Sequence, residues 1–256
     1  MIQPETTRDP AFAESLRAHR PDVLAVASYG ELLRTDVLEL APHGAINVHG
    51  SLLPRWRGAS PVQAALLAGD SETGVSIQRM VLALDAGDVL LERRTAIPPG
   101  ETAGDLFERL SLIGAEALID ALDALEDGTA TFTPQDESAI TICRKLTKQA
   151  GLLDWSEPAE LLERRVRAMH PWPGARTFLP DGRALGVLEA RIVDLPGGTA
   201  PPEPGTLLQA PGLTIAAGER ALELVKIKPA GKGAMEAEAF QRGARLEPGT
   251  RFGARG

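Results

Sequence analysis

Two polar side chains close a short apolar stretch in the segment GAINVHG, residues 44–50. If this stretch is a strand, Asn47 and His49 point to the same face of a sheet and stand near the end of the strand. Ligands of open α/β sheets bind in the crevice outside such carboxyl ends. A neutral imidazole can accept a proton, and an amide N–H can stabilise an oxyanion. The pair thus indicates acyl-transfer chemistry, although a turn histidine and a capping asparagine are the simpler interpretation of two residues alone.

A third polar group strengthens this hypothesis. The segment ALDAGDVL places Asp85 and Asp88 in a glycine-containing turn between two expected strands. A carboxylate beside an imidazole orients the ring and raises its basicity, so Asn47, His49 and Asp85 would together form a coherent site. No serine or cysteine is clearly paired with His49, although Ser51 is close in sequence. This pattern favours direct transfer of an acyl group to a substrate nucleophile over a covalent enzyme intermediate.

Other classes of chemistry lack their sequence signals. No GxGxxG follows an expected strand and no GxxxxGK[ST] is present, which argues against dinucleotide and P-loop sites. The four histidines and the single Cys143 have no metal-ligand spacing, so we expect no metal. One cysteine cannot form an internal disulfide, which fits a reducing compartment. No apolar run approaches the ~18 residues of a membrane span, and the first residues resemble no targeting signal. We therefore expect a cytoplasmic protein without a membrane partner.

Strands and helices alternate in the first half, which predicts an α/β domain with a mostly parallel sheet. The expected strands are compact apolar runs, and the strongest helix repeats its leucines and isoleucines at close to helical spacing. The expected strands are 22–30, 44–50, 74–81 and 88–97, and the expected helices are 10–20, 31–40, 61–69 and 102–125.

The second half differs from the first in hydrophobic periodicity and in charge. After Gly128 a stretch without periodicity reads as a surface linker, followed by a helix at 157–169 and short strands typical of a small β-barrel or sandwich. Residues 1–143 carry 10 Lys and Arg against 22 Asp and Glu, whereas residues 144–256 carry 17 against 13. The asymmetry suggests two domains, with a polyanion as a plausible partner of the second. Mild compositional drift is the simpler explanation of the charge alone.

Several long motifs resemble a known family. The segment INVHGSLLPRWRGASP and the later LDAGDVL closely resemble the catalytic core of folate-dependent formyltransferases, and within that superfamily the branch that acts on methionyl-tRNA. The segment KLTKQAGLLDWSEPAELLERRVRAMHPWPGART resembles the opening of that branch's C-terminal domain, and EAFQRGARLEPGTRF resembles its end. Together these motifs cover nearly the whole chain.

The resemblance implies a fold, a reaction and a set of site residues. It implies a Rossmann-like catalytic domain at 1–128, a linker at 129–147 and an OB-like tRNA-binding domain at 148–256. The implied reaction moves a formyl group from 10-formyltetrahydrofolate to the α-amino group of methionyl-initiator tRNA. Asn47 would stabilise the oxyanion, and His49, held by Asp85, would handle either the proton or the oxyanion. The segment that matches the folate contacts comprises Ser51, Leu52, Leu53 and Pro54.

The resemblance also gives the basic residues a role. Phosphate contacts by a basic stripe would fix the position of tRNA and supply salt-sensitive affinity, although we expect at least half of the residues to be ordinary surface charges. We expect Trp172, between two prolines, to be a structural plug rather than a base-stacking residue, and we expect a monomer. The candidate tRNA-contacting residues are Arg144, Lys145, Lys148, Arg164, Arg165 and Arg167.

Two alternatives compete with this function. One is a formyltransferase acting on a small amine, such as an amino sugar or glycinamide ribonucleotide, which the basic second half disfavours. The other is an inactive copy that retains RNA binding. This last alternative arises because relatives open with a βαβ unit that has no counterpart before the strand at 22–30. We favour a start upstream of Met1. If the protein begins at Met1, we expect an unpaired strand edge, aggregation and little activity.

Overall fold

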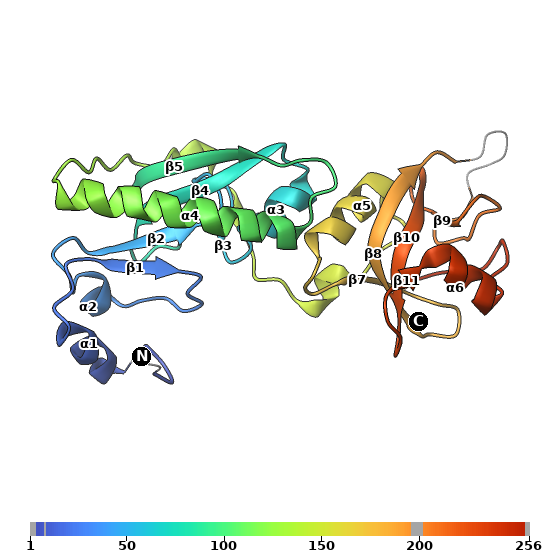
Figure 1. Ribbon diagram of the computed structural model, residues 1–256, viewed down its shortest axis with the longest axis horizontal. Coiled ribbons are helices and arrows are strands. Elements are labelled where there is room, and N and C mark those ends of the chain that lie inside the picture. Colours follow the sequence, from blue (N-terminus) through green and yellow to red (C-terminus); the bar gives the residue numbers. More distant parts are fainter. Residues whose placement is uncertain (1–3, 8, 196–201, 254–256) are drawn as a thin grey trace. The chain divides into compact units, whose positions relative to one another are not determined.

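The computed structural model describes residues 4–7, 9–195 and 202–253. By their contacts the residues divide into two compact units (Figure 1). The first unit contains Met1–Ala65, Asp70–Pro99 and Asp105–Lys145, and the second contains Leu66–Gly69, Gly100–Gly104 and Leu146–Gly256. In the part of the chain that the structure describes, no helix is long and apolar enough to cross a membrane.

A four-stranded sheet forms the centre of the first unit. Its strands are β1 (Leu24–Ala27), β2 (Ala45–His49), β4 (Glu72–Arg79) and β5 (Val89–Ala96), in the order β1-β2-β4-β5. The structure confirms the α/β fold, but the described sheet is mixed. Only β1 and β2 are parallel, whereas β4 is antiparallel to both β2 and β5. The short connection between β4 and β5 cannot make the long crossover that parallel neighbours require, so these strands pair as a hairpin.

Helices cover both faces of this sheet. The long α4 (Ala103–Glu126) buries Leu106, Leu110, Ala117 and Ala121. It approaches the sheet so closely at Gly114 that a Cβ there would lie 2.9 Å from the Val48 side chain. Because Val48 and His49 are adjacent in β2, they point to opposite faces. The face that α4 covers is therefore not the one that carries His49.

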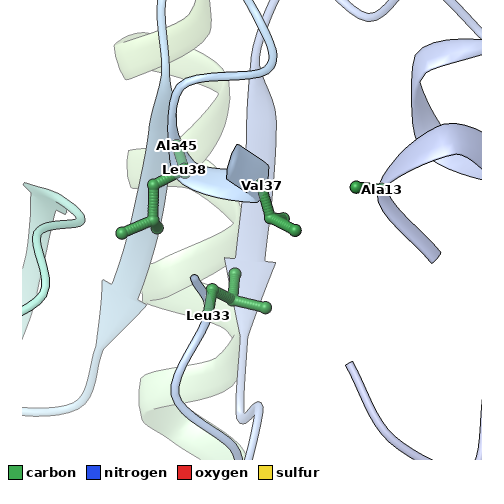
Figure 2. Packing of buried hydrophobic residues seen from close by; sticks show 5 residues of the cluster. All are labelled: Ala13, Leu33, Val37, Leu38 and Ala45. Carbon is green, nitrogen blue, oxygen red and sulfur yellow. The ribbon is translucent and has the colours of Figure 1, made fainter. Parts of the chain in front are cut away.

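A small apolar cluster packs around β1 and β2 (Figure 2). It involves α1 (Pro10–Arg17), which the Asp9 carboxylate caps by accepting from the Ala11 N–H, and α2 (Thr35–Leu38). The helix expected over 31–40 is thus much shorter than predicted. The buried members of the cluster are Ala13, Leu33, Val37, Leu38 and Ala45.

The remaining short elements of the first unit surround the segment after β2. They are β3 (Arg57–Gly58), α3 (Pro61–Ala68, whose last residues belong to the second unit), the 3₁₀ turn η1 (Glu137–Ala139) and β6 (Ile142–Cys143). The strand β6 pairs in parallel with β3. The stretch at 129–147, expected to be an irregular linker, therefore contributes a strand to the first unit.

An antiparallel sheet forms the second unit, together with η2 (Lys148–Gly151), α5 (Ala159–Ala168) and α6 (Ala237–Ala244). The sheet order is β11-β10-β8-β7, with β9 also paired to β10. The expected barrel is not closed among the described residues, because the edge strand β7 has only isolated bridges besides its ladder with β8. The strands are β7 (Ala175–Phe178), β8 (Ala184–Val193), β9 (Leu213–Ala216), β10 (Ala221–Pro229) and β11 (Met235–Glu236).

Candidate active site

The end of β2 presents the two polar residues that the sequence indicates. In the ladder with β4, Asn47 lies opposite Gln78 and His49 lies opposite Ser76. His49 is buried, with 5% of its surface exposed, and Asn47 is half-buried. No hydrogen bond of the Asn47 side chain is seen among the described residues, so its amide is available to an incoming group.

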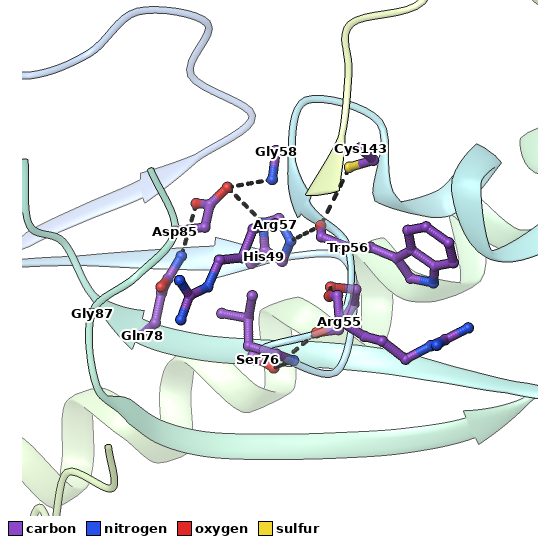
Figure 3. Close-up of polar contacts among 12 residues, drawn as sticks. His49, Arg55, Trp56, Arg57, Gly58, Ser76, Gln78, Asp85, Gly87 and Cys143 are labelled. Atoms are coloured by element: carbon purple, nitrogen blue, oxygen red, sulfur yellow. Dashed lines mark hydrogen bonds and ion pairs between the residues drawn. The ribbon is translucent and has the colours of Figure 1, made fainter. Parts of the chain in front are cut away.

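Asp85 lies in the turn between β4 and β5, close to His49 (Figure 3). One carboxylate oxygen accepts a hydrogen bond from the Gly58 backbone N–H at 2.8 Å, and the other accepts from the Gln78 amide at 2.8 Å. The His49 Nδ1 atom lies 3.8 Å from Asp85 Oδ2. This separation suits an ion pair with a protonated ring and exceeds a direct hydrogen bond, and such contacts commonly tighten when substrate is bound.

The second ring nitrogen of His49 determines where its proton lies. The Nε2 atom is 2.9 Å from the Trp56 carbonyl oxygen. Because a carbonyl can only accept, Nε2 must carry a hydrogen in this contact. In the neutral ring, Nδ1 is then the nitrogen with the free lone pair, and it faces the Asp85 carboxylate. The geometry therefore leaves Nδ1 as the atom that can take up a proton.

Residues 51–54 form a tight turn whose polar groups mostly bond within the protein. The buried Ser51 hydroxyl donates to the Arg55 carbonyl at 2.5 Å, and the Ser76 hydroxyl donates to the Ser51 carbonyl at 2.8 Å. Ser76 Oγ also accepts from the Leu53 N–H at 3.0 Å. Leu53 is buried, whereas Leu52 and Pro54 are half-buried. Of the four predicted folate-contacting residues, these last two therefore leave the most side-chain surface accessible.

The tryptophan between two arginines stabilises this turn. The Trp56 indole N–H donates to Asp70 at 2.8 Å, and the Arg55 guanidinium pairs with the same carboxylate at 2.5 Å. Arg55 also stacks over the Trp56 ring, with 4.8 Å between the guanidinium carbon and the ring centroid. Arg57 points elsewhere and donates from Nε to Gln135 at 2.9 Å. Reasoning from sequence missed Asp70, Gln78 and Gln135, which carry no local signal because their partners are distant in the chain.

The predicted basic stripe does not form a continuous free surface. Arg165 is ion-paired with Glu157, and Arg167 is ion-paired with Glu163. Both arginine side chains are mostly buried, and the paired glutamates compensate their charges. Arg164, also in the second unit, donates weakly to the Ala68 carbonyl at 3.3 Å. Of the six predicted tRNA-contacting residues, Arg144, Lys145 and Lys148 are exposed and have no ion pair in the part of the chain that the structure describes.

Trp172 does not behave as the expected plug. Trp172 has 54% of its surface exposed to solvent. The flanking prolines hold the backbone, but the ring does not fill the interior of the second unit. The interpretation of this residue as a buried structural plug is therefore wrong.

Cys143 gives a prediction about reactivity. The thiol is 7% exposed and donates to the Trp56 carbonyl at 3.3 Å. Burial raises its pKa, and the negative charge of Asp85 raises it further. Since only the thiolate is nucleophilic, we expect iodoacetamide at pH 8 to modify the folded protein at least ~10-fold more slowly than the urea-unfolded protein. Equal rates, followed by mass spectrometry, would contradict this description of the thiol.

The chain matches known protein families over both halves. Residues 1–122 match the family described as formyl transferase, and residues 145–245 match the formyl transferase C-terminal domain. A methionyl-tRNA formyltransferase from Methylobacterium sp. (strain 4-46) is 49% identical over 256 residues, which covers 98% of this chain and 80% of that protein.

Solved structures share the fold at low sequence identity. HypX from Aquifex aeolicus, crystallised with tetrahydrofolic acid, has a TM-score of 0.67 and 18% identity, covering 94% of this chain and 41% of that one. A likely sugar N-formyltransferase from Mycobacterium tuberculosis has a TM-score of 0.61 and 23% identity, covering 75% of this chain and 82% of that one. At such identities the likeness concerns the fold alone.

Proposed function

The chain belongs to the formyl transferase family, and on this premise we propose that it transfers a formyl group from 10-formyltetrahydrofolate to the α-amino group of methionyl-initiator tRNA. The observation that carries this proposal is the 49% identity to a methionyl-tRNA formyltransferase over 98% of the chain, which includes the second unit. Sugar N-formyltransferases are similar at only 23% identity, so a small amine is not favoured as the acceptor. The protein would act in the cytoplasm, as a monomer, in translation initiation.

The site residues suggest how the transfer proceeds. The neutral α-amino group attacks the formyl carbon, and the carbonyl oxygen becomes an oxyanion. The free amide of Asn47 would donate to that oxygen at the end of β2. The proton released by the amine passes to Nδ1 of His49, and the Asp85 carboxylate stabilises the imidazolium that results. When the bond between the formyl carbon and the folate nitrogen breaks, His49 returns the proton to that nitrogen. The products are the N-formylated aminoacyl-tRNA and tetrahydrofolate.

Each substrate has a different candidate binding region. The turn formed by Ser51, Leu52, Leu53 and Pro54 lies directly after His49 and would contact the folate. Its internal hydrogen bonds stiffen it before any ligand arrives, which lowers the ordering cost of binding. For tRNA, the exposed cations Arg144, Lys145 and Lys148 are better candidates than Arg165 and Arg167, whose charges glutamates neutralise. Contacts of this kind would weaken as salt concentration rises.

A direct assay tests the proposed function. The 256-residue chain is incubated with a radiolabelled formyl donor and methionyl-initiator tRNA, and label in the precipitated tRNA is counted. We expect label on the charged tRNA and none on uncharged tRNA of the same sequence, because only the former carries the amine. Label on amino sugars or glycinamide ribonucleotide alone would instead support the small-amine alternative. Binding of tRNA without transfer would support the inactive alternative.

A further inference from the structure

A glutamine from the segment that leaves the first unit bonds to the backbone of the Asp85 turn. The Gln135 side-chain nitrogen lies 2.9 Å from the Asp85 carbonyl oxygen and 2.7 Å from the Gly87 carbonyl oxygen. Gln135 follows Asp85 by 50 residues in the sequence. Two backbone contacts hold the segment there: Thr133 forms an antiparallel bridge with Val89, and β6, a few residues further on, pairs with β3. The segment expected to be a linker thus holds the backbone of the Asp85 turn through two hydrogen bonds.

The orientation of the Gln135 amide follows from its other contact. The Arg57 Nε–H donates to the oxygen of that amide at 2.9 Å. Since guanidinium groups only donate, the atom facing Arg57 must be the oxygen, and the NH₂ group must face the two carbonyls. Arg57 is itself 9% exposed, so its side chain is held by packing. The Arg57 guanidinium thus donates to the Gln135 oxygen, and the Gln135 NH₂ group donates to the two carbonyl oxygens, so every donor faces an acceptor.

The Asp85 turn needs such support because its backbone is unfavourable. Asp85 adopts a φ of 48°, in the left-handed region, which is unfavourable for a non-glycine residue and persists only where its surroundings hold it. Two residues later, Gly87 packs so tightly that a Cβ would lie 1.8 Å from the Arg79 carbonyl oxygen. The β4–β5 ladder is also irregular between Ile77 and Gln78. The conformation of this turn is therefore imposed by tertiary contacts.

We propose that Gln135 is a positioning residue for the transfer reaction, which acts by fixing the backbone of the Asp85 turn so that the carboxylate faces His49. This inference rests on the proposed function. Gln135 touches the turn's backbone, Arg57 and, at 3.4 Å, the Gln78 amide that donates to Asp85, rather than the reacting groups, so its contribution passes through Asp85. Loss of its donor group lowers the rate of the chemical step and leaves the binding of both substrates nearly unchanged.

The Gln135→Glu variant tests this role. It keeps the length of the side chain and the acceptor that Arg57 uses, but it replaces the donor NH₂ with an oxygen that faces two carbonyl oxygens. Because a displacement of about 1 Å can cost about 100-fold in rate, we expect kcat to fall by roughly 10- to 100-fold. We expect KM for each substrate to stay within about threefold. Gln209→Glu makes the same chemical change at an exposed position of the second unit and is the matched control.

A double-mutant cycle separates positioning from a general structural role. Gln135→Glu is also introduced into an Asp85→Asn background, where the carboxylate charge is already absent. If Gln135 acts through Asp85, the second substitution lowers kcat by less than about twofold there, because residues that act as a unit are non-additive. Equal losses in both backgrounds, or a rise in KM at constant kcat, would overturn the inference. Circular dichroism and thermal melting check that each variant is folded, and Gln135→Met serves as a second variant of similar length.

One readout does not depend on turnover. The Gly58 N–H donates to the Asp85 carboxylate, so displacement of the turn exposes this amide to solvent. We expect hydrogen exchange at Gly58 to accelerate in Gln135→Glu and to remain unchanged in Gln209→Glu. If the unsubstituted protein formylates no acceptor, the proposed function is rejected, and this exchange measurement alone decides the structural part of the inference. Unchanged exchange at Gly58 would overturn it.

Discussion

Replacement of His49 by glutamine is expected to lower kcat for formyl transfer by about 1,000-fold, within the range that general acid–base catalysis contributes. Glutamine can still donate from its amide to the Trp56 carbonyl, which His49 Nε2 contacts at 2.9 Å. It has no basic atom to replace Nδ1 beside Asp85, so the proton of the attacking amine has no acceptor. Because the substitution leaves Asn47 and the 51–54 turn in place, KM for both substrates should change by less than about threefold.

The measurement is a steady-state formylation assay together with thermal melting of the variant and the parent protein. His43→Gln is the matched control, because His43 is exposed and lies outside the site. The Tm of His49→Gln should remain within a few degrees of the parent, since the buried donor is retained. If His49→Gln keeps more than about a tenth of the parent kcat, His49 does not handle the proton. Such a result would support the other candidate role of His49, which is to stabilise the oxyanion together with Asn47.

Sequence reasoning succeeded where a property is local. The apolar run that ends in Asn47 and His49 forms β2, and the glycine-containing turn after β4 contains Asp85. Strand periodicity and turn chemistry act over a few residues, so these features can be read from a short window. His49 and Asp85 do converge, but not at the shared end of parallel strands: antiparallel β4 ends at Arg79, opposite Ile46, and the turn after it brings Asp85 back to His49.

What the sequence could not predict depends on contacts between distant segments. The stretch around Gln135 has no periodicity, so it resembled an inert linker. Its strand β6 consists of only two residues and exists because β3 offers a partner. The pairing of Arg165 with Glu157, eight residues away and before α5, likewise required the three-dimensional position of that carboxylate, whereas Glu163 and Arg167 are four residues apart in α5, a spacing that helical periodicity could have indicated. A charge count alone treats such arginines as free.

Gly58 is constrained both by its local backbone conformation and by a contact with a distant segment. Its replacement by alanine is therefore expected to destabilise the first unit strongly. Its φ of 122° is accessible almost only to glycine. A Cβ at this position would lie 2.0 Å from the Cys143 carbonyl oxygen, which accepts a hydrogen bond from the Ala59 N–H in the β3–β6 pair. Backbone strain and overpacking each cost about 1–3 kcal/mol, so we expect a loss of roughly 3 kcal/mol or more in the free energy of unfolding.

The same substitution should also lower activity, because the Gly58 N–H is one of the two donors that hold the Asp85 carboxylate. A loss of this size corresponds to a fall in Tm of roughly 6–12 °C for a domain of about 150 residues. Gly128→Ala is the matched control: its φ of 67° is also positive, but a Cβ there would meet no atom within 4 Å, so it should cost only about 1 kcal/mol. Calorimetry and kcat of the two variants test the difference. If Gly58→Ala melts like Gly128→Ala and keeps the parent kcat, the β3–β6 pair neither supports the unit nor positions Asp85, and the link between the supposed linker and the reaction would be lost.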